Sequence, residues 1–155
     1  ALINWNEYEN MANEKNFDIY LHKIKELDCR VEYLSIRTTI ITNYFPNDEF
    51  ITCLHKWNNL IHLDLTNCIG IVEKTLAKIL SLCSKLESLN LTQCHLVNGE
   101  CLKNDHLPIN LNKLILDYCS GIQEKTLSII LGRLEFLEYL SLRGLILGPE
   151  IVYFI

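Results

Sequence analysis

The stretch LIHLDLTNC at residues 60–68 recurs as LESLNLTQC at 86–94 and as LNKLILDYC at 111–119, so all three copies read LxxLxLxxC. Degenerate copies, VEYLSIRTT at 31–39 and LEYLSLRGL at 137–145, flank them. The five copies begin 29, 26, 25 and 26 residues apart. A nearly fixed period in the twenties indicates a chain built from structural repeats that stack on their neighbours.

A second repeated stretch follows the motif. IVEKTLAKIL at 71–80 and IQEKTLSIIL at 122–131 are identical at seven positions. Their apolar residues, with those just beyond, fall at helical spacing, which predicts helices over 71–83 and 122–134. Inside LxxLxL the last two leucines lie two residues apart, as in a short strand with one buried face. We therefore expect parallel strands to begin near residues 32, 61, 87, 112 and 138.

These units determine the predicted fold class. A strand and a helix of this length cannot bury their apolar faces alone, so the repeats must share one core. The prediction is an α/β protein: a right-handed leucine-rich-repeat solenoid, or horseshoe, of about five repeats. Its parallel strands would line the concave face and its helices the convex face. Residues 29–155 would form this domain, and residues 1–28 an N-terminal helical cap, because apolar residues between 17 and 27 share one helical face.

Three regions depart from the repeat pattern. The linker at 40–49 carries extra residues with Pro46 and should bulge. Asn104, Asp105 and Pro108 interrupt the helix pattern of the repeat at 86–110. The last residues, 151–155, are mainly apolar, whereas a solenoid normally ends in a polar capping unit. We therefore expect the domain to be incomplete at its C-terminus, or covered there by a partner.

The cysteines fit the same framework. Cys68, Cys94 and Cys119 fill the last motif position, and we expect them to point inward as small buried groups. Cys101 is expected to be a half-exposed helix residue that reacts faster than these three. The chain has seven cysteines, an odd number, with no tightly paired framework, which favours a reducing intracellular compartment, the cytoplasm or nucleus.

The motif with its terminal cysteine, together with the CxxL of Cys83 to Leu86 at a helix end, resembles the cysteine-containing leucine-rich repeats of F-box substrate receptors of ubiquitin ligases. The resemblance covers roughly residues 29–147. It implies a protein that reads a substrate protein for a ligase. Residues 1–28 contain no F-box, the part that would dock a ligase adaptor.

No arrangement of residues indicates catalysis, a cofactor or a metal, and we expect no enzyme. Cys94, His95, Cys101 and His106 could suggest zinc, but Cys94 belongs to the inward series and structural zinc sites prefer tighter CxxC pairs. The Glu-Lys pairs of the two similar helices are interpreted as solvated surface. A net charge of −5 without a Lys/Arg cluster argues against nucleic acid, and no apolar run suggests a membrane span.

A protein partner is the remaining expectation, docked on the concave face or at the C-terminal edge. The strand positions between the leucines face away from the core and are available for contact. Tyrosine and arginine are over-represented among interface hot spots. The candidate partner-binding residues are Tyr33, Arg37, His62, Asp64, Asn90, Lys113, Asp117, Tyr139 and Arg143.

Two functions therefore remain open. The first is a non-enzymatic interaction module, as the substrate-reading part of a ubiquitin-ligase receptor. The second is a small structural or assembly subunit of a larger complex, because the chain also looks like the short mitochondrial leucine-rich-repeat proteins associated with ATP synthase and with assembly of respiratory complex I. This second function would imply a mitochondrial location.

Overall fold

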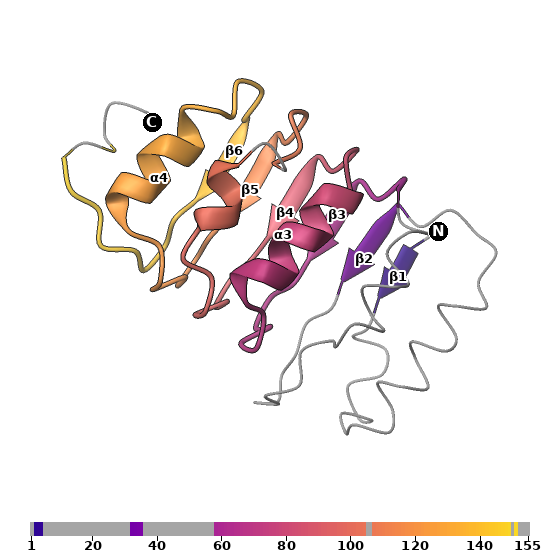
Figure 1. Cartoon of the computed structure of the whole chain (residues 1–155), viewed down its shortest axis with the longest axis horizontal. Helices are drawn as coiled ribbons and strands as arrows, with labels where there is room; N and C mark the ends of the chain where they lie inside the picture. The colour runs from indigo at the N-terminus through magenta and orange to yellow at the C-terminus, as the bar shows by residue number, and fades with distance from the viewer. Residues whose placement is uncertain (1, 5–31, 36–57, 105–106, 150, 152–155) are drawn as a thin grey trace.

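Six strands of three residues each form one sheet in the computed structural model, which describes residues 2–4, 32–35, 58–104, 107–149 and 151 (Figure 1). Their order in the sheet is their order in the chain, and every neighbouring pair is parallel. The strands are β1 (Leu2–Asn4), β2 (Tyr33–Ser35), β3 (His62–Asp64), β4 (Ser88–Asn90), β5 (Lys113–Ile115) and β6 (Tyr139–Ser141).

The expected strands are confirmed, since β2 to β6 each begin one residue after the predicted start. Strand β1 was not predicted. The helical cap expected over 1–28 is wrong at Leu2–Asn4, which pair as a strand with β2. Residues 5–28 of that cap, and the linker at 40–49, lie outside the described residues.

Within the described part of the chain, three helices lie on one face of this sheet: α3 (Glu73–Leu82), the 3-10 helix η3 (Glu100–Lys103) and α4 (Glu124–Leu131) (Figure 1). The predictions for 71–83 and 122–134 are confirmed. The weak helical pattern of the middle repeat gives only the four residues of η3, which ends where Asn104 turns extended. The result is an α/β fold with an all-parallel sheet, and we call the sheet face opposite these helices the open face.

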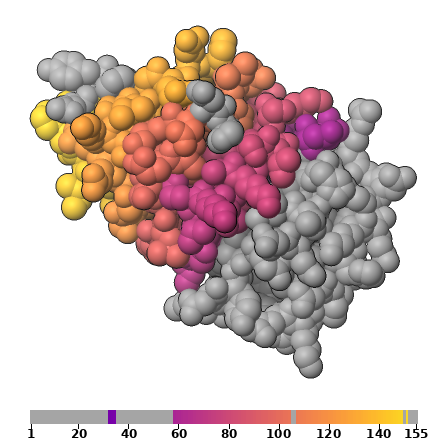
Figure 2. Space-filling model, in the orientation of Figure 1, coloured from indigo at the N-terminus to yellow at the C-terminus, as the bar shows by residue number. Residues whose placement is uncertain are grey.

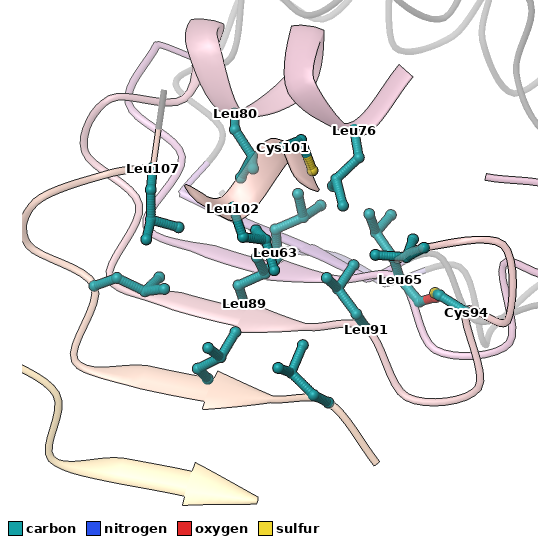
Figure 3. Packing of buried hydrophobic residues seen from close by; sticks show 14 of the residues in the cluster. Leu63, Leu65, Leu76, Leu80, Leu89, Leu91, Cys94, Cys101, Leu102 and Leu107 are labelled. Carbon is teal, nitrogen blue, oxygen red and sulfur yellow. The ribbon is translucent and has the colours of Figure 1, made fainter. Parts of the chain in front are cut away.

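The core lies between the sheet and the helices. In Figure 3, Leu76 and Leu80 of α3 point toward the strand leucines Leu63 and Leu89, with Leu102 of η3 in the same cluster. Burial of one leucine side chain contributes about 1.5–3 kcal/mol, so the repeated leucines dominate stability. The strand and motif leucines that are fully or almost fully buried are Leu34, Leu60, Leu63, Leu65, Leu86, Leu89, Leu91, Leu111, Leu114 and Leu116.

The helical spacing over 71–83 places Val72 on the same apolar face as four residues further along, but only those four are buried. Leu76, Ile79, Leu80 and Cys83 are buried as the helical spacing predicts. Val72 is 44% exposed, which contradicts its predicted inward position. The reason is local: Val72 is the extended N-cap residue before α3, so its side chain does not follow the helical period.

In each of the turns after β3, β4, β5 and β6, one residue has left-handed backbone geometry. Asn67, Gln93, Tyr118 and Gly144 have φ angles of 63°, 62°, 58° and 73°. This geometry turns the N–H groups of Asn67, Gln93 and Tyr118 toward the following unit, where they donate to carbonyl oxygens at 2.8, 2.8 and 2.7 Å. Left-handed geometry costs a non-glycine residue roughly 1–2 kcal/mol, so the bonds between units offset a local strain.

Successive units are therefore joined by backbone as well as by leucines. Figure 2 shows that the units follow one another in chain order along the molecule, with side chains in contact. Backbone hydrogen bonds between units also form where the strands start. The carbonyl oxygen of Ile61 accepts bonds from the N–H groups of Glu87 and Ser88, at 2.9 and 3.0 Å. The backbone carbonyl oxygens of Glu87 and Asn112 accept equivalent pairs of bonds from N–H groups of the next unit.

Glu73, in the first turn of α3, also connects two units. Its carboxylate accepts bonds from the backbone N–H groups of Asn98 at 2.6 Å, Gly99 at 2.8 Å and Cys101 at 2.7 Å. These groups lie at the start of η3, where a helix leaves its N–H groups without internal partners. The expectation that Glu73 is only solvated surface is wrong, because the stacking of units brings the start of η3 against it.

Replacing Glu73 should therefore destabilise the protein. We expect Glu73→Ala to lower the free energy of unfolding by about 2 kcal/mol, because charged hydrogen bonds to the start of η3 are lost. Urea denaturation followed by circular dichroism measures this change. Glu135→Ala is the control, since it removes the same charge from an exposed position and should change stability by less than about 0.5 kcal/mol. Equal effects of the two substitutions would contradict this role of Glu73.

Candidate protein-binding surface

A row of side chains crosses the open face of the sheet. The strand register aligns the first residues of β2 to β6, and we call these the first row: Tyr33, His62, Ser88, Lys113 and Tyr139. Adjacent strand residues face opposite sides, and the leucine that follows each first-row residue is buried in β2 to β5 and partly buried in β6. The first row therefore faces away from the core.

Two pairs within the first row are in direct contact. The rings of Tyr33 and His62 lie 5.8 Å apart, tilted by 46°. At the other end of the row, Lys113 Nζ lies 4.8 Å from the centre of the Tyr139 ring, a cation–π contact. His62 and Lys113 are exposed, and Tyr139 is 48% exposed. These contacts hold the side chains in place, which lowers the entropy cost of ordering them against a partner.

The polar residues at the strand ends have a structural role instead. Asp64 Oδ1 accepts bonds from the backbone N–H and the hydroxyl of Thr66, at 3.0 and 2.6 Å. Asn90 Oδ1 accepts the same two bonds from Thr92, at 3.0 and 2.7 Å. Each side chain thus fixes the turn that follows its own strand. Asp64 is only 6% exposed, so the expectation that it is available to a partner is wrong.

Asp117 fixes a turn in the neighbouring unit. Its Oδ1 accepts bonds from the Ser141 hydroxyl at 2.6 Å and from the Arg143 backbone N–H at 2.8 Å. Ser141 occupies the position that Asp64 holds in β3, and its shorter side chain does not bond to the N–H two residues on. The Asp117 carboxylate, from the preceding unit, accepts the bond from this N–H group instead. Asp117 is therefore engaged in the fold, whereas the Arg143 side chain is exposed beside it.

The structure thus divides the nine predicted residues into three groups. Register brings together Tyr33, His62, Lys113 and Tyr139 in the first row, and Arg143 is exposed at the turn after β6. Asp64, Asn90 and Asp117 are bonded within the fold. Arg37 lies outside the described residues.

An open hollow lies at the N-terminal ends of β4 to β6, and it was not predicted from the sequence. It has a volume of about 510 Å³ and contains Phe136, which is 61% exposed. The loop between α4 and β6 contributes residues 135–138 to the lining of this hollow. No periodic pattern marks such a loop, so the sequence carried no signal for it. The lining residues are Glu87, Asn110, Asn112, Glu135, Phe136, Leu137 and Glu138.

The thiols lie inside the fold. Cys68, Cys94 and Cys119 are at most 1% exposed, as predicted, and all three are free thiols. The Sγ atoms of Cys94 and Cys119 donate to the carbonyl oxygens of Leu65 and Leu91 in the preceding units, at 3.2 and 2.9 Å. The expectation of a half-exposed Cys101 is wrong: it is 3% exposed, because η3 packs it toward the core (Figure 3).

Burial makes these thiols weak acids. It raises the pKa of Cys83 to about 12 and that of Cys119 to about 11, and it also raises the pKa values of Cys68, Cys94 and Cys101. A thiol with a raised pKa supplies little thiolate, the form that reacts or binds metal. Within the described ranges, no group of three or more histidine, cysteine, aspartate or glutamate residues could hold a metal ion.

No protein-family model matches the chain. Among the residues that the structure describes, no helix has the length and apolar character needed to cross a membrane.

The buried thiols should resist alkylation. In the folded protein we expect iodoacetamide at neutral pH to modify Cys101 as slowly as Cys68, Cys94 and Cys119, because all four are buried. Site-resolved mass spectrometry during a time course measures the rates, and the same protein in denaturant is the control. Rapid modification of Cys94 or Cys101 before unfolding would contradict their placement.

Stability should fall at alkaline pH. The unfolded chain loses the Cys119 proton near the ordinary pKa of 9.0, whereas the folded protein keeps it until pH is about 11. The stabilisation is therefore complete below pH 9 and is lost as pH rises toward 11, by about 1.4 kcal/mol per pH unit for one thiol. Denaturation across this range should give a shallower slope for Cys119→Ala than for the unmodified chain. Parallel curves would contradict the assignment.

Proposed function

We propose that this chain is a leucine-rich-repeat protein that binds a protein partner through the open face of its parallel sheet. The observation that carries the proposal is the first row, in which two contacting pairs of large side chains lie in register across five strands. Tyrosines lie at both ends of this row, and tyrosine is one of the residue types enriched among interface hot spots.

Two features support the assignment of the repeat class. The motif leucines are buried at equivalent positions in three consecutive units, and the hydrogen bonds between units recur at equivalent atoms. In this proposal the units wind into a right-handed horseshoe, with the open face as its concave surface. A concave sheet presents a partner with many residues at once, which suits recognition of a folded protein or an extended segment.

The partner class follows from the resemblance to ubiquitin-ligase receptors. In such a receptor the first row would contact the substrate protein, and no chemistry would be required of the repeats themselves. A second candidate, a subunit of a larger assembly, is favoured by a different observation: the last unit exposes apolar residues, among them Ile146 at 97% and Leu147 at 38%.

The experiment for the first candidate replaces both Tyr139 and Arg143 with Ala. We expect thermal stability to stay nearly unchanged, because both side chains are substantially exposed. Affinity for a partner captured from the source cells should weaken by about 2–4 kcal/mol, if these residues are hot spots. Titration calorimetry with the purified partner measures this difference.

Replacement of Lys74 and Lys125 with Ala is the matched control, because both residues are exposed on helices α3 and α4. This variant should bind the partner with unchanged affinity. Normal binding by the Tyr139/Arg143 variant, with loss of binding in the helix variant, would place the partner on the helices and exclude the open face.

A further inference from the structure

The hollow at the N-terminal ends of β4 to β6 combines negative charge with an exposed aromatic ring. Three of its lining residues are glutamates, two are asparagines, and one is Phe136, which is 61% exposed. Its volume of about 510 Å³ is in the range of pockets that enclose small ligands, so it can hold a long side chain of a partner. The carboxylates belong to Glu87, Glu135 and Glu138, and the amides to Asn110 and Asn112.

The three carboxylates of the hollow have no positive partner in the described part of the chain. Neither a hydrogen bond nor an ion pair joins their side chains to another described residue. The nearest lysines in the sequence are held elsewhere: Lys85 Nζ donates to Asn59 Oδ1 at 2.7 Å. Lys113 Nζ lies over the Tyr139 ring, and Arg133 does not line the hollow. The hollow therefore presents uncompensated negative charge to an incoming group.

The exposure of Phe136 follows from its position within the repeat. Phe136 directly precedes the first motif leucine of its unit, as Lys85 and Asn110 do in the two preceding units. Lys85 and Asn110 are exposed, although their strands β4 and β5 each lie between two neighbouring strands. This position therefore faces solvent in inner units as well. A phenylalanine there, where the preceding units carry polar residues, leaves its ring available to a ligand.

Backbone hydrogen bonds fix the spacing of two of the carboxylates. The carbonyl oxygen of Glu87 accepts bonds from the N–H groups of Asn112 and Lys113, at 2.9 and 3.0 Å. The carbonyl oxygen of Asn112 accepts bonds from the N–H groups of Glu138 and Tyr139, at 2.7 and 2.9 Å. Glu87 and Glu138 thus lie on either side of Asn112, about 10 Å apart at the backbone.

This arrangement suits a guanidinium better than an ammonium. A guanidinium is planar and has N–H donors on both edges, so it can donate to carboxylates on two sides while its face lies against an aromatic ring. An ammonium is a compact point charge that lacks this flat face and this fork of donors. The lining of the hollow therefore selects arginine among the positively charged side chains.

We propose that the hollow binds an arginine side chain of the protein partner, with the guanidinium between Glu87 and Glu138 and against the ring of Phe136. The inference rests on the proposed function for the partner being a protein. It adds the partner residue that is recognised and a second place of contact beside the first row. The two places adjoin, because Asn112 and Glu138 directly precede Lys113 and Tyr139 of the first row.

The first test titrates the unmodified chain with the peptide acetyl-Gly-Arg-Gly-amide, followed through the backbone amide signals in NMR spectra. We expect saturable shifts at residues 87, 112 and 136–138, with a dissociation constant on the order of 1 mM. The same peptide with citrulline, which keeps the shape without the charge, should bind about tenfold more weakly. The lysine peptide should bind about threefold more weakly. Shifts confined to other residues, or equal binding of the citrulline or lysine peptide, would overturn the proposal.

Substitutions in the lining form the second test. Glu87→Gln combined with Glu138→Gln removes both charges at nearly constant shape and should weaken binding of the arginine peptide about tenfold. Phe136→Leu removes the ring and should weaken it about two- to fivefold. Unchanged affinity of either variant would overturn its assigned contact. If the double variant does not fold by circular dichroism, Phe136→Leu and the three peptides decide the outcome.

Glu32→Gln is the matched control, because Glu32 holds the same position before β2 that Glu87 holds before β4. It is exposed and lies outside the hollow, so this variant should bind the arginine peptide like the unmodified chain. A loss equal to that of the double variant would indicate a general effect of net charge and would contradict the site.

The peptide also separates this inference from the proposed function, because it carries no residue for the first row. The Tyr139/Arg143 variant should therefore bind the arginine peptide with unchanged affinity. If the peptide does not bind while that variant loses the purified partner, the hollow is excluded and the open face stands. If the peptide binds while that variant keeps the partner, the open face is excluded and the arginine site stands.

Discussion

The stacking of one strand unit on the next is the interaction on which the rest of the structure depends. A strand of three residues has too few hydrogen bonds and too little buried area to be stable alone. Each unit becomes stable when the leucines of both neighbours close its core and when its N–H groups donate to carbonyl oxygens 24 or 25 residues further along the chain. Among the described residues, the units of β3, β4 and β5 each lie between two neighbouring strands.

This dependence divides the polar residues into two groups with different roles. Those at the ends of the strands, such as Asp64 and Asn90, are used to fix the turns that let units approach each other. Those at the beginnings of the strands, such as His62 and Lys113, have no such task and face away from the core. On the open face, the polar side chains that stay available to a partner therefore lie at the beginnings of the strands, in the first row.

The proposed site on the open face would select its partner by the chemistry of its side chains. The open face offers side chains, so its specificity would come from the tyrosines and the lysine of the first row.

The sequence by itself determined the elements and the buried leucines. Strand starts to within one residue, both long helices, the weak helix near Asn104 and the inward Cys94 all follow from periods of two or 3.6 residues, which are local signals. Only the tertiary structure decided the roles of Glu73, Asp117 and Cys101. Their partners or surroundings lie in the adjacent unit, and no local period records which atoms the stacking brings together across 24 to 28 residues.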